Sequence, residues 1–183
     1  MKLIKFFLLI LLSFNITVKA NSNDKIQSLL KEGGKLIFIR HAVAPGSGDP
    51  IDFDLLRCET QRNLSKDGIV QSQNIGKFFS DNNIKIDKVL SSEWCRCKQT
   101  AQYAFNKYET KSFLNSFFSA KFASNKNKQI NNLKKYINEW SGDNNLVLVT
   151  HYVTIQEVLN ITSSSGELII VDKNFNVLAR QNF

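Results

Sequence analysis

Four short apolar runs along the chain predict the strands of a sheet. They cover residues 36–39, 89–90, 146–149 and 168–171. The first run is continuous rather than alternating, which is typical of a strand buried on both faces. Helical patterns lie between the first three runs. This alternation of strand and helix indicates a three-layer α/β sandwich with a mainly parallel central sheet.

The helices are predicted from apolar spacing and from the residues at their ends. Ser65 can cap a helix that runs to about residue 81. A short helix over 25–31 should end at Gly33 and Gly34, because glycine readily takes the left-handed conformation that closes a helix. A third helix is predicted after residue 90, with an apolar face formed by Cys97, Ala101, Ala104, Phe105 and Tyr108. A fourth is predicted after residue 129, with an apolar face formed by Ile130, Leu133, Ile137 and Trp140.

Length and composition favour a single folded domain over residues 21–183. The chain has 183 residues, of which 43% are hydrophobic and 22% charged, so it can bury a real core. This composition excludes a disordered chain, and the missing long apolar runs exclude a polytopic membrane protein. Residues 45–58 lack periodicity and are rich in Gly, Ser and Pro at their start, which predicts a loop over the sheet edge.

The first twenty residues predict an export signal. A basic start precedes an apolar stretch over residues 6–14, and Val18 and Ala20 supply the small residues that a signal peptidase needs. An uncleaved membrane anchor is disfavoured, because the stretch has about half of the roughly 20 residues that span a bilayer. We expect the mature chain to be secreted across the inner membrane into the periplasm, without membrane insertion. The periplasm is oxidising, which bears on the cysteines.

The positive charge of the chain does not indicate a nucleic-acid partner. The formal net charge is +8, but three lysines lie in the first twenty residues, where there are no acids, which leaves +5 for residues 21–183. These charges are spread along the chain rather than clustered. Nucleic-acid binding is therefore disfavoured.

The two histidines of the chain occupy equivalent positions. His41 and His151 each follow a strand of four apolar residues and one polar residue. Because the carboxyl ends of parallel strands form the ligand crevice of an open α/β sheet, the two rings should meet there. A histidine at one strand end can simply be a hydrogen-bonded structural residue, but the pair makes that interpretation weaker.

Two arginines add positive charge to the same edge of the sheet. Arg40 precedes His41, and Arg96 lies near the start of the helix that follows residues 89–90. Guanidinium groups bind phosphate oxygens in pairs and keep their charge, so the set suits a dianionic phosphate. A metal site is the competing interpretation. It needs three or four His, Cys or carboxylate ligands, and the arginines would repel the cation.

Four blocks of sequence resemble the histidine phosphatase superfamily, which has the phosphoglycerate mutase-like fold. They occur in the order found in that family and span about residues 35–171. The blocks are Leu36-Ile37-Phe38-Ile39-Arg40-His41-Ala42, Leu64-Ser65-x-x-Gly68, Ser91-Ser92-x-x-x-Arg96-x-x-x-Thr100-Ala101 and Val147-Leu148-Val149-Thr150-His151. The short length and the expected export are similar to the small phosphatase members rather than to the mutases.

The resemblance implies a chemistry for these residues. His41 would attack phosphorus in line to form a phosphohistidine that water then hydrolyses. Arg40, Arg96 and His151 would hold the phosphoryl oxygens and stabilise the charge that develops there. Neither a metal nor another cofactor is required. Arg62 is a further candidate contact to phosphate, with a solvated arginine ahead of the Ser65 cap as the alternative.

The chain departs from the family at the acid that protonates the leaving group. Many members carry a glutamate where this chain has residues 114–118, which contain no acid, and the other large branch has Asp where this chain has Tyr152. His151, Asp49 and Glu167 remain candidates for the proton donor. A good leaving group would not need a strong acid, so the substrate range rather than the activity would be limited.

Three cysteines in an oxidising compartment suggest one disulfide and one thiol. Cys95 and Cys97 are two apart at a helix start and point in different directions, so Cys58 should pair with one of them. Cys97 stands where the family commonly has a small buried alanine. The resemblance therefore favours a Cys58–Cys95 bond. Phe113, Phe117 and Phe118 are expected in the core, with the pocket wall as the alternative.

The function predicted from sequence is hydrolysis of a small phosphorylated substrate through a phosphohistidine on His41. A phosphomutase is disfavoured by the expected export and the missing acid. Because fold does not fix function, a catalytically weak phospho-ligand-binding protein of the cell envelope is the alternative from another class.

Overall fold

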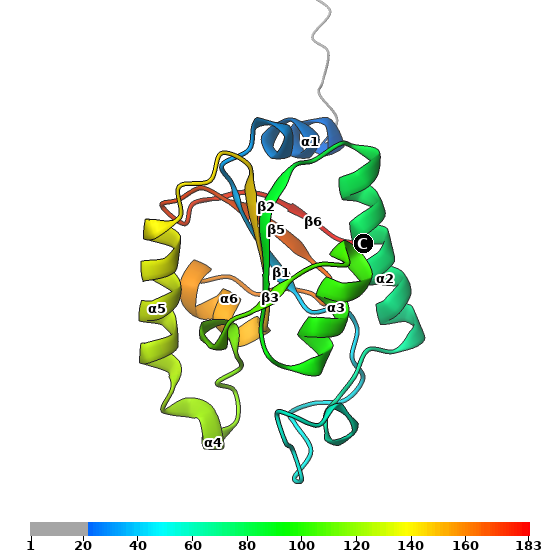
Figure 1. The fold of residues 1–183 in the computed structure, drawn as a ribbon, viewed down its shortest axis with the longest axis vertical. Coiled ribbons are helices and arrows are strands. Elements are labelled where there is room, and N and C mark those ends of the chain that lie inside the picture. The colour runs from blue at the N-terminus through cyan, green and yellow to red at the C-terminus, as the bar shows by residue number, and fades with distance from the viewer. Residues whose placement is uncertain (1–21) are drawn as a thin grey trace, which may run out of the picture.

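A six-stranded sheet runs through the middle of the protein in its computed structural model, which describes residues 22–183 (Figure 1). In spatial order the sheet is β3-β2-β4-β1-β5-β6. In chain order the strands are β1 (Leu36–Arg40), β2 (Ile86–Ser91), β3 (Glu109–Thr110), β4 (Asn145–Thr150), β5 (Leu168–Val171) and β6 (Val177–Gln181). The expected export signal over residues 1–20 lies outside the described residues.

The sheet is mainly parallel, as the sequence predicts, with two antiparallel pairings at one side. β1 pairs in parallel with β4, β4 with β2, and β2 with β3. β5 is antiparallel to β1, and β6 to β5. The reversal follows from the connection after β4: the chain returns to the sheet edge where β4 ends, and Gly166 N–H donates to the Arg40 carbonyl at 3.1 Å. β5 starts there and runs back along β1. β3 and β6 are strands that the sequence analysis did not predict.

Helices cover both faces of this sheet (Figure 1). α1, α2 and α3 contribute to a core cluster on one face, and α5 and α6 to a second cluster on the other. The predicted helices are confirmed, although the first begins earlier than expected. The helices are α1 (Ser22–Glu32), α2 (Lys66–Asp81), α3 (Cys95–Phe105), α4 (Ala120–Ala123), α5 (Lys126–Glu139) and α6 (Tyr152–Leu159), with 3-10 turns η1 (Cys58–Thr60) and η2 (Ser112–Leu114).

The predicted apolar faces form the core. Leu133 and Ile137 of α5, with Trp140 directly after the helix, pack against the face of the sheet that also carries Leu36 and Phe38. Ile130 is also buried. On the opposite face, Cys97 and Ala101 of α3 pack with Ile37 and Ile39. Alternate residues of β1 thus enter different cores, which explains why this strand is continuously apolar.

The start of α2 is fixed against the segment that follows β1. Ser65 caps the helix, and its hydroxyl accepts from Gly68 N–H at 3.1 Å. Ser65 N–H in turn donates to the Val43 carbonyl at 3.0 Å. A Cβ on Gly68 would collide with the same carbonyl oxygen. The Leu-Ser-x-x-Gly block is therefore structural: it places the chain just after His41.

Within residues 22–183, no helix has the length and apolar character needed to cross a membrane.

Candidate active site

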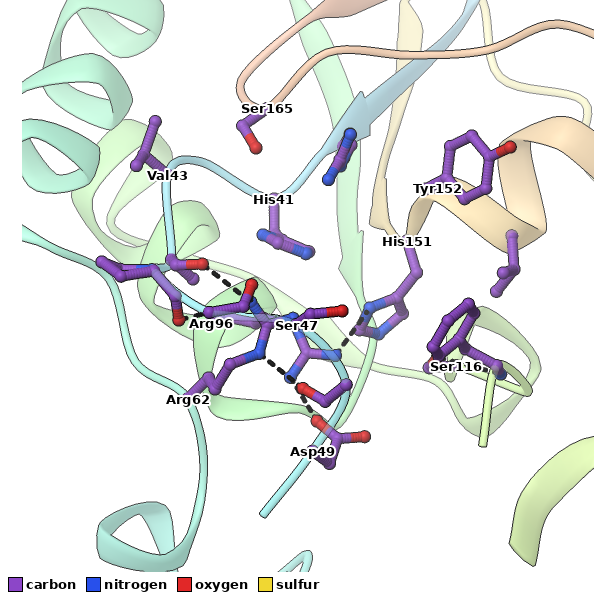
Figure 2. A pocket seen from close by; sticks show the side chains of 17 residues that line it. His41, Val43, Ser47, Asp49, Arg62, Arg96, Ser116, His151, Tyr152 and Ser165 are labelled. Atoms are coloured by element: carbon purple, nitrogen blue, oxygen red, sulfur yellow. Dashed lines mark hydrogen bonds and ion pairs between the residues drawn. The ribbon is translucent and has the colours of Figure 1, made fainter. Parts of the chain in front are cut away.

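The two histidines meet at the carboxyl ends of neighbouring strands, as predicted. His41 follows β1 and His151 follows β4, and their ring centroids are 5.6 Å apart. His41 N–H donates to the Thr150 carbonyl at 3.0 Å, which fixes the two strand ends together. Both rings line a cavity of about 400 Å³ that Arg40, Arg62 and Arg96 also line (Figure 2). The structure thus brings all five predicted site residues to one pocket.

His41 is held as a neutral ring with a defined hydrogen position. It is 4% exposed, and its Nδ1 lies 2.9 Å from the Ala42 carbonyl oxygen. Because a carbonyl only accepts, Nδ1 carries the hydrogen and Nε2 carries the lone pair. Burial, aided by the charge of Arg96, lowers the pKa of His41 to about 3. A neutral ring with a lone pair on Nε2 is the form that a nucleophile requires.

Arg40 and Arg96 bring two guanidinium groups to the pocket, that of Arg96 buried and that of Arg40 half-buried. Arg96 is 3% exposed, and Arg40 donates from Nη1 to the Ser163 carbonyl at 2.6 Å. Their Nε–H groups are buried and have no hydrogen-bond partner among the described residues. Because unpaired buried donors are costly, an oxyanion that accepts from such groups would be stabilised here.

Arg62 holds the loop over the pocket. Its guanidinium donates to the carbonyls of Gly48 at 2.6 Å, Gly46 at 2.6 Å and Ala44 at 2.8 Å. The side chain also lines the pocket (Figure 2), so its predicted contact to phosphate stays a prediction. The sequence analysis missed its role in the loop. The signal was present, because a glycine-rich loop leaves carbonyls that need donors.

The structure separates the three candidates for the proton donor. Asp49 lines the pocket, but its oxygens accept from Arg96 Nη1 at 2.8 Å and from Trp94 Nε1 at 3.1 Å. Glu167 does not line the pocket and forms an ion pair with Arg180 at 2.7 Å. His151 lines the pocket, and burial together with the Arg96 charge keeps its pKa well below the usual range.

A disulfide joins the loop to the helix that carries Arg96. Cys58 and Cys95 are bonded, as the sequence analysis favoured. Cys97 is buried as a thiol, and burial raises its pKa to about 12. Its position in the core is confirmed, but its Sγ also lies 3.5 Å from His151 Nε2, a contact that the sequence did not reveal.

The three phenylalanines after α3 have different environments. Phe117 is buried, and Phe113 packs with its ring centroid 5.4 Å from that of Tyr136. Phe118 is 63% exposed and lines the pocket. The expected core position therefore fits the first two, and the pocket wall fits the third.

Comparison with known families agrees with this geometry. Residues 36–115 match the model of the histidine phosphatase superfamily (branch 1). This part of the chain is therefore similar to that superfamily. The matched region contains His41, Arg62 and Arg96, whereas His151 lies beyond it and is brought to the pocket by β4. The predicted class, a phosphatase of the histidine phosphatase type, is thereby supported at the level of the family.

Solved structures share the fold at low sequence identity. The protein histidine phosphatase SixA, solved in complex with tungstate, is 15% identical, with a TM-score of 0.57 over 81% of this chain and 96% of SixA. A phosphoglycerate mutase from Thermus thermophilus is 14% identical, with a TM-score of 0.58 over 81% of this chain and 99% of the mutase. A protein from Escherichia coli K-12, assigned as an alpha-ribazole-5'-P phosphatase, is 16% identical, with a TM-score of 0.58 over 80% of this chain and 95% of that protein. A sequence comparison with curated proteins returned no match.

Proposed function

We propose that this protein is an exported phosphomonoester hydrolase of the histidine phosphatase type that works through a phosphohistidine on His41 without a metal ion. The observation that carries the proposal is the state of His41. Its hydrogen is held on Nδ1 by the Ala42 carbonyl at 2.9 Å, and its pKa is lowered to about 3. The Nε2 lone pair is therefore available at neutral pH, where a surface histidine would be partly protonated.

Arg40 and Arg96 would supply the charge that stabilises the transferring phosphoryl group. They approach the pocket from the end of β1 and the start of α3. In a loose phosphoryl transition state the charge lies on the three equatorial oxygens, so fixed donors around them lower the barrier. Within residues 22–183 no group of three or more His, Cys, Asp or Glu side chains is placed to hold a metal ion. Metal independence is part of the proposal, because the arginines can supply the positive charge.

The mouth of the pocket fits a small phosphorylated substrate with an apolar part. Val43, Phe118 and Tyr152 line the same cavity as the charged groups. The cavity of about 400 Å³ is at the small end of the range for small-molecule sites. We therefore expect the phosphate to bind among the arginines, and the leaving group to contact these side chains.

Export is supported by two independent features. The first is the signal sequence predicted over residues 1–20. The second is the Cys58–Cys95 disulfide, since structural disulfides persist in oxidising compartments. A periplasmic location is the proposal that fits both features. Cell fractionation followed by mass measurement of the N-terminus tests it, with a mature chain that starts at Asn21 as the expected result.

The experiment that tests the activity measures hydrolysis of p-nitrophenyl phosphate in the presence of a chelator. The expected result is turnover that survives the chelator and falls at least about a thousandfold in His41→Ala, because the nucleophile is lost. Rapid acid-free quenching should trap an acid-labile phosphoenzyme in the wild-type protein. Arg57→Ala is a suitable control, because Arg57 lies on the surface with a side chain that is 57% exposed.

A phospho-ligand-binding protein is the second candidate, and one observation favours it. Asp49 is the only carboxylate that lines the pocket within the described residues, and both of its oxygens are engaged. A weak catalyst that still binds phosphate would result if substrates needed an acid. Tight binding of inorganic phosphate without a phosphoenzyme or turnover would support this candidate and contradict the hydrolase.

A further inference from the structure

Ser92 forms a buried link between His151 and Asn115. Its side chain follows β2 and is fully buried. The hydroxyl oxygen lies 2.8 Å from His151 Nε2 and 3.1 Å from Asn115 Oδ1. Because no solvent reaches the hydroxyl, its single hydrogen must go to a buried neighbour: one of these two groups, or the thiol of Cys97, which also forms a hydrogen bond with Ser92.

The orientation of Asn115 indicates where that hydrogen goes. Asn115 Oδ1 accepts from the backbone N–H of Glu93 at 2.9 Å, and Asn115 Nδ2 donates to the Glu93 carboxylate at 2.6 Å. A backbone N–H only donates and a carboxylate accepts, so the amide oxygen faces Ser92. Ser92 can therefore donate to Asn115, and its lone pairs then accept from Trp94 N–H at 3.2 Å and from His151 Nε2–H.

The opposite side of the His151 ring leads to the same assignment. Arg96 Nη2 lies 3.4 Å from His151 Nδ1 (Figure 2). Since a guanidinium only donates, Nδ1 must be the acceptor, and the hydrogen of the neutral ring is on Nε2. An acceptor at Nε2, the Ser92 hydroxyl, and a donor at Nδ1, the Arg96 guanidinium, thus favour the same tautomer. It is the reverse of the tautomer of His41, whose hydrogen is on Nδ1.

We propose that Ser92 and Asn115 are positioning residues that keep the His151 hydrogen on Nε2, so that Nδ1 accepts a proton from a phosphoryl group bound as its monoanion. This inference rests on the proposed hydrolase and deepens it. It gives His151 the role of a proton acceptor, whereas the family resemblance implies a ring that holds phosphoryl oxygens. The same proton can then reach the leaving group. This matters because Asp49, the carboxylate of the pocket, is already paired with Arg96.

The proton and electron pairs balance in both steps. In the first, the His41 Nε2 lone pair forms the N–P bond, and the P–O bond breaks with its electron pair on the leaving oxygen. The proton of the substrate monoanion passes through His151 Nδ1 to that oxygen. In the second, water attacks phosphorus and gives a proton to Nδ1, the N–P bond electrons return to His41, and the proton joins the released phosphate.

The groups around His151 determine how its proton affinity responds to a ligand. Arg96 and Cys97 approach it from α3 and His41 from β1, while Arg40 and Arg62 contribute positive charge across the pocket. The charged members of this set are positive, and among the described pocket residues only Asp49, paired with Arg96, opposes them. Together with burial, these positive charges disfavour protonation of the ring. A bound phosphoryl group offsets them, so the proton can move onto Nδ1 only when the anion is present.

Nitrogen NMR of the histidine rings tests the tautomer directly. The chain has two histidines, so protein made without a histidine tag and labelled with ¹⁵N-histidine gives the nitrogen signals of two rings, which His41→Ala assigns. We expect His41 to show hydrogen on Nδ1 and His151 to show hydrogen on Nε2 at neutral pH. A His151 ring with hydrogen on Nδ1, or on both nitrogens, would overturn the proposal. This readout does not depend on turnover, so a correct tautomer without any phosphoenzyme would contradict the hydrolase alone.

Variants of Ser92 test the positioning role. Ser92→Ala should shift part of the His151 population to the other tautomer and lower kcat by about tenfold, within the range for lost acid–base assistance. Ser92→Thr keeps the hydroxyl and should restore both readouts. Ser91→Ala is the matched control, because the Ser91 hydroxyl donates to the Ser92 carbonyl at 2.8 Å and does not contact His151. An unchanged tautomer in Ser92→Ala would contradict the role.

The protonation state of the substrate gives a second measurement. Phosphate monoesters lose their second proton near pH 6, and ring substituents on phenyl phosphates move this pKa. If the monoanion reacts, kcat/KM should fall as pH rises through the second pKa of each ester. The midpoint of that fall should move with the ester. A midpoint at the same pH for all esters, or a rate that rises through the second pKa, would overturn the proposal.

Discussion

Asp49 and Arg96 form a buried ion pair inside the pocket, with Asp49 Oδ1 and Arg96 Nη1 2.8 Å apart. Their side chains are 9% and 4% exposed, and the second carboxylate oxygen accepts from Trp94 Nε1. Asp49 belongs to the loop that follows His41, whereas Arg96 belongs to α3. The loop therefore presents its own anion to an arginine that would bind phosphate. A substrate must compete with this carboxylate.

Replacing Asp49 should separate stability from phosphate binding. In Asp49→Asn the buried charge of Arg96 loses its partner, so we expect the free energy of unfolding to fall by roughly 2 to 4 kcal/mol. Inorganic phosphate should bind more tightly, because the competing anion is gone, and should restore more stability than it adds to the wild-type protein. Denaturant unfolding with and without phosphate measures both effects. Equal phosphate affinity in the two proteins would show that Asp49 does not compete.

Arg62 and Arg57 provide a matched pair for the loop. Arg62 donates to four loop carbonyls, whereas Arg57 pairs at the surface with Asp54 at 2.9 Å. We expect Arg62→Ala to lower the free energy of unfolding by about 1 to 2 kcal/mol, because several part-buried or exposed carbonyls lose a charged donor. Arg57→Ala should change it by less than about 1 kcal/mol. Denaturant unfolding gives these values, and equal effects of the two substitutions would contradict the assigned role of Arg62.

Titration with inorganic phosphate then tests whether Arg62 also contacts the ligand. Arg62→Lys keeps the positive charge but loses the planar guanidinium, whose several N–H groups donate to different carbonyls. If Arg62 only orders the loop, the lysine variant should lose stability while its phosphate affinity changes little. A large loss of affinity at unchanged stability would instead support the direct contact predicted from sequence.

The disulfide should stabilise the folded chain by reducing the conformational entropy of the unfolded chain. Cys58 and Cys95 are separated by 37 residues, for which the loop-entropy model gives roughly 3 to 4 kcal/mol. A reductant should therefore lower the denaturation midpoint of the wild-type protein, and the double variant Cys58→Ala, Cys95→Ala should start at the lower value and not respond. Thiol labelling of the native, unreduced protein should leave Cys97 unmodified, because it is buried. A midpoint that is insensitive to reductant in the wild-type protein would contradict the prediction.

The parts of the fold that sequence predicts are those with local signals. The continuous apolar run of β1, the Ser65 cap and the stripe of α5 each follow from spacing within one element. β3 was missed because it has only two residues, both exposed. β6 was missed because its residues are exposed or half-buried and its apolar run stops after Ala179. The direction of β5 depends on where the chain returns after α6, and short apolar runs look the same in parallel and antiparallel strands.

The site shows the same division between local and long-range information. His41 and His151 could be assigned to one rim because each directly follows a strand. The Asp49–Arg96 pair and the Ser92–His151 contact join residues 47 and 59 positions apart, and only the packed chain reveals them. Arg62 illustrates the limit: the sequence offers it as a candidate phosphate contact or a solvated arginine, but its hydrogen bonds to the loop depend on how residues 44–48 fold.

The two buried histidines should make stability fall as the protein is acidified below neutral pH. Both have folded pKa values below the ordinary 6.5, about 3 for His41 and well below the usual range for His151, because burial disfavours the charged ring. At a pH between the lowered pKa of each folded ring and the ordinary 6.5, the unfolded chain binds more protons than the folded one. The free energy of unfolding therefore rises with pH in this range and falls on acidification. Each histidine should contribute about 1.4 kcal/mol per pH unit once its unfolded form is protonated.

The window from pH 6.5 to 5 isolates this effect. The carboxyl groups with lowered pKa values, Asp54, Glu167 and Asp172, have ordinary values of 4.5 or below and contribute only at lower pH. Denaturant unfolding across the window should show a slope that approaches two protons, as expected for a chain with two histidines. His41→Asn should reduce that slope by one proton, and His151→Asn should do the same. A stability that is flat over this range, or a slope unchanged by His41→Asn, would mean that the ring is not held neutral, and the nucleophile assigned to it would lose its physical basis.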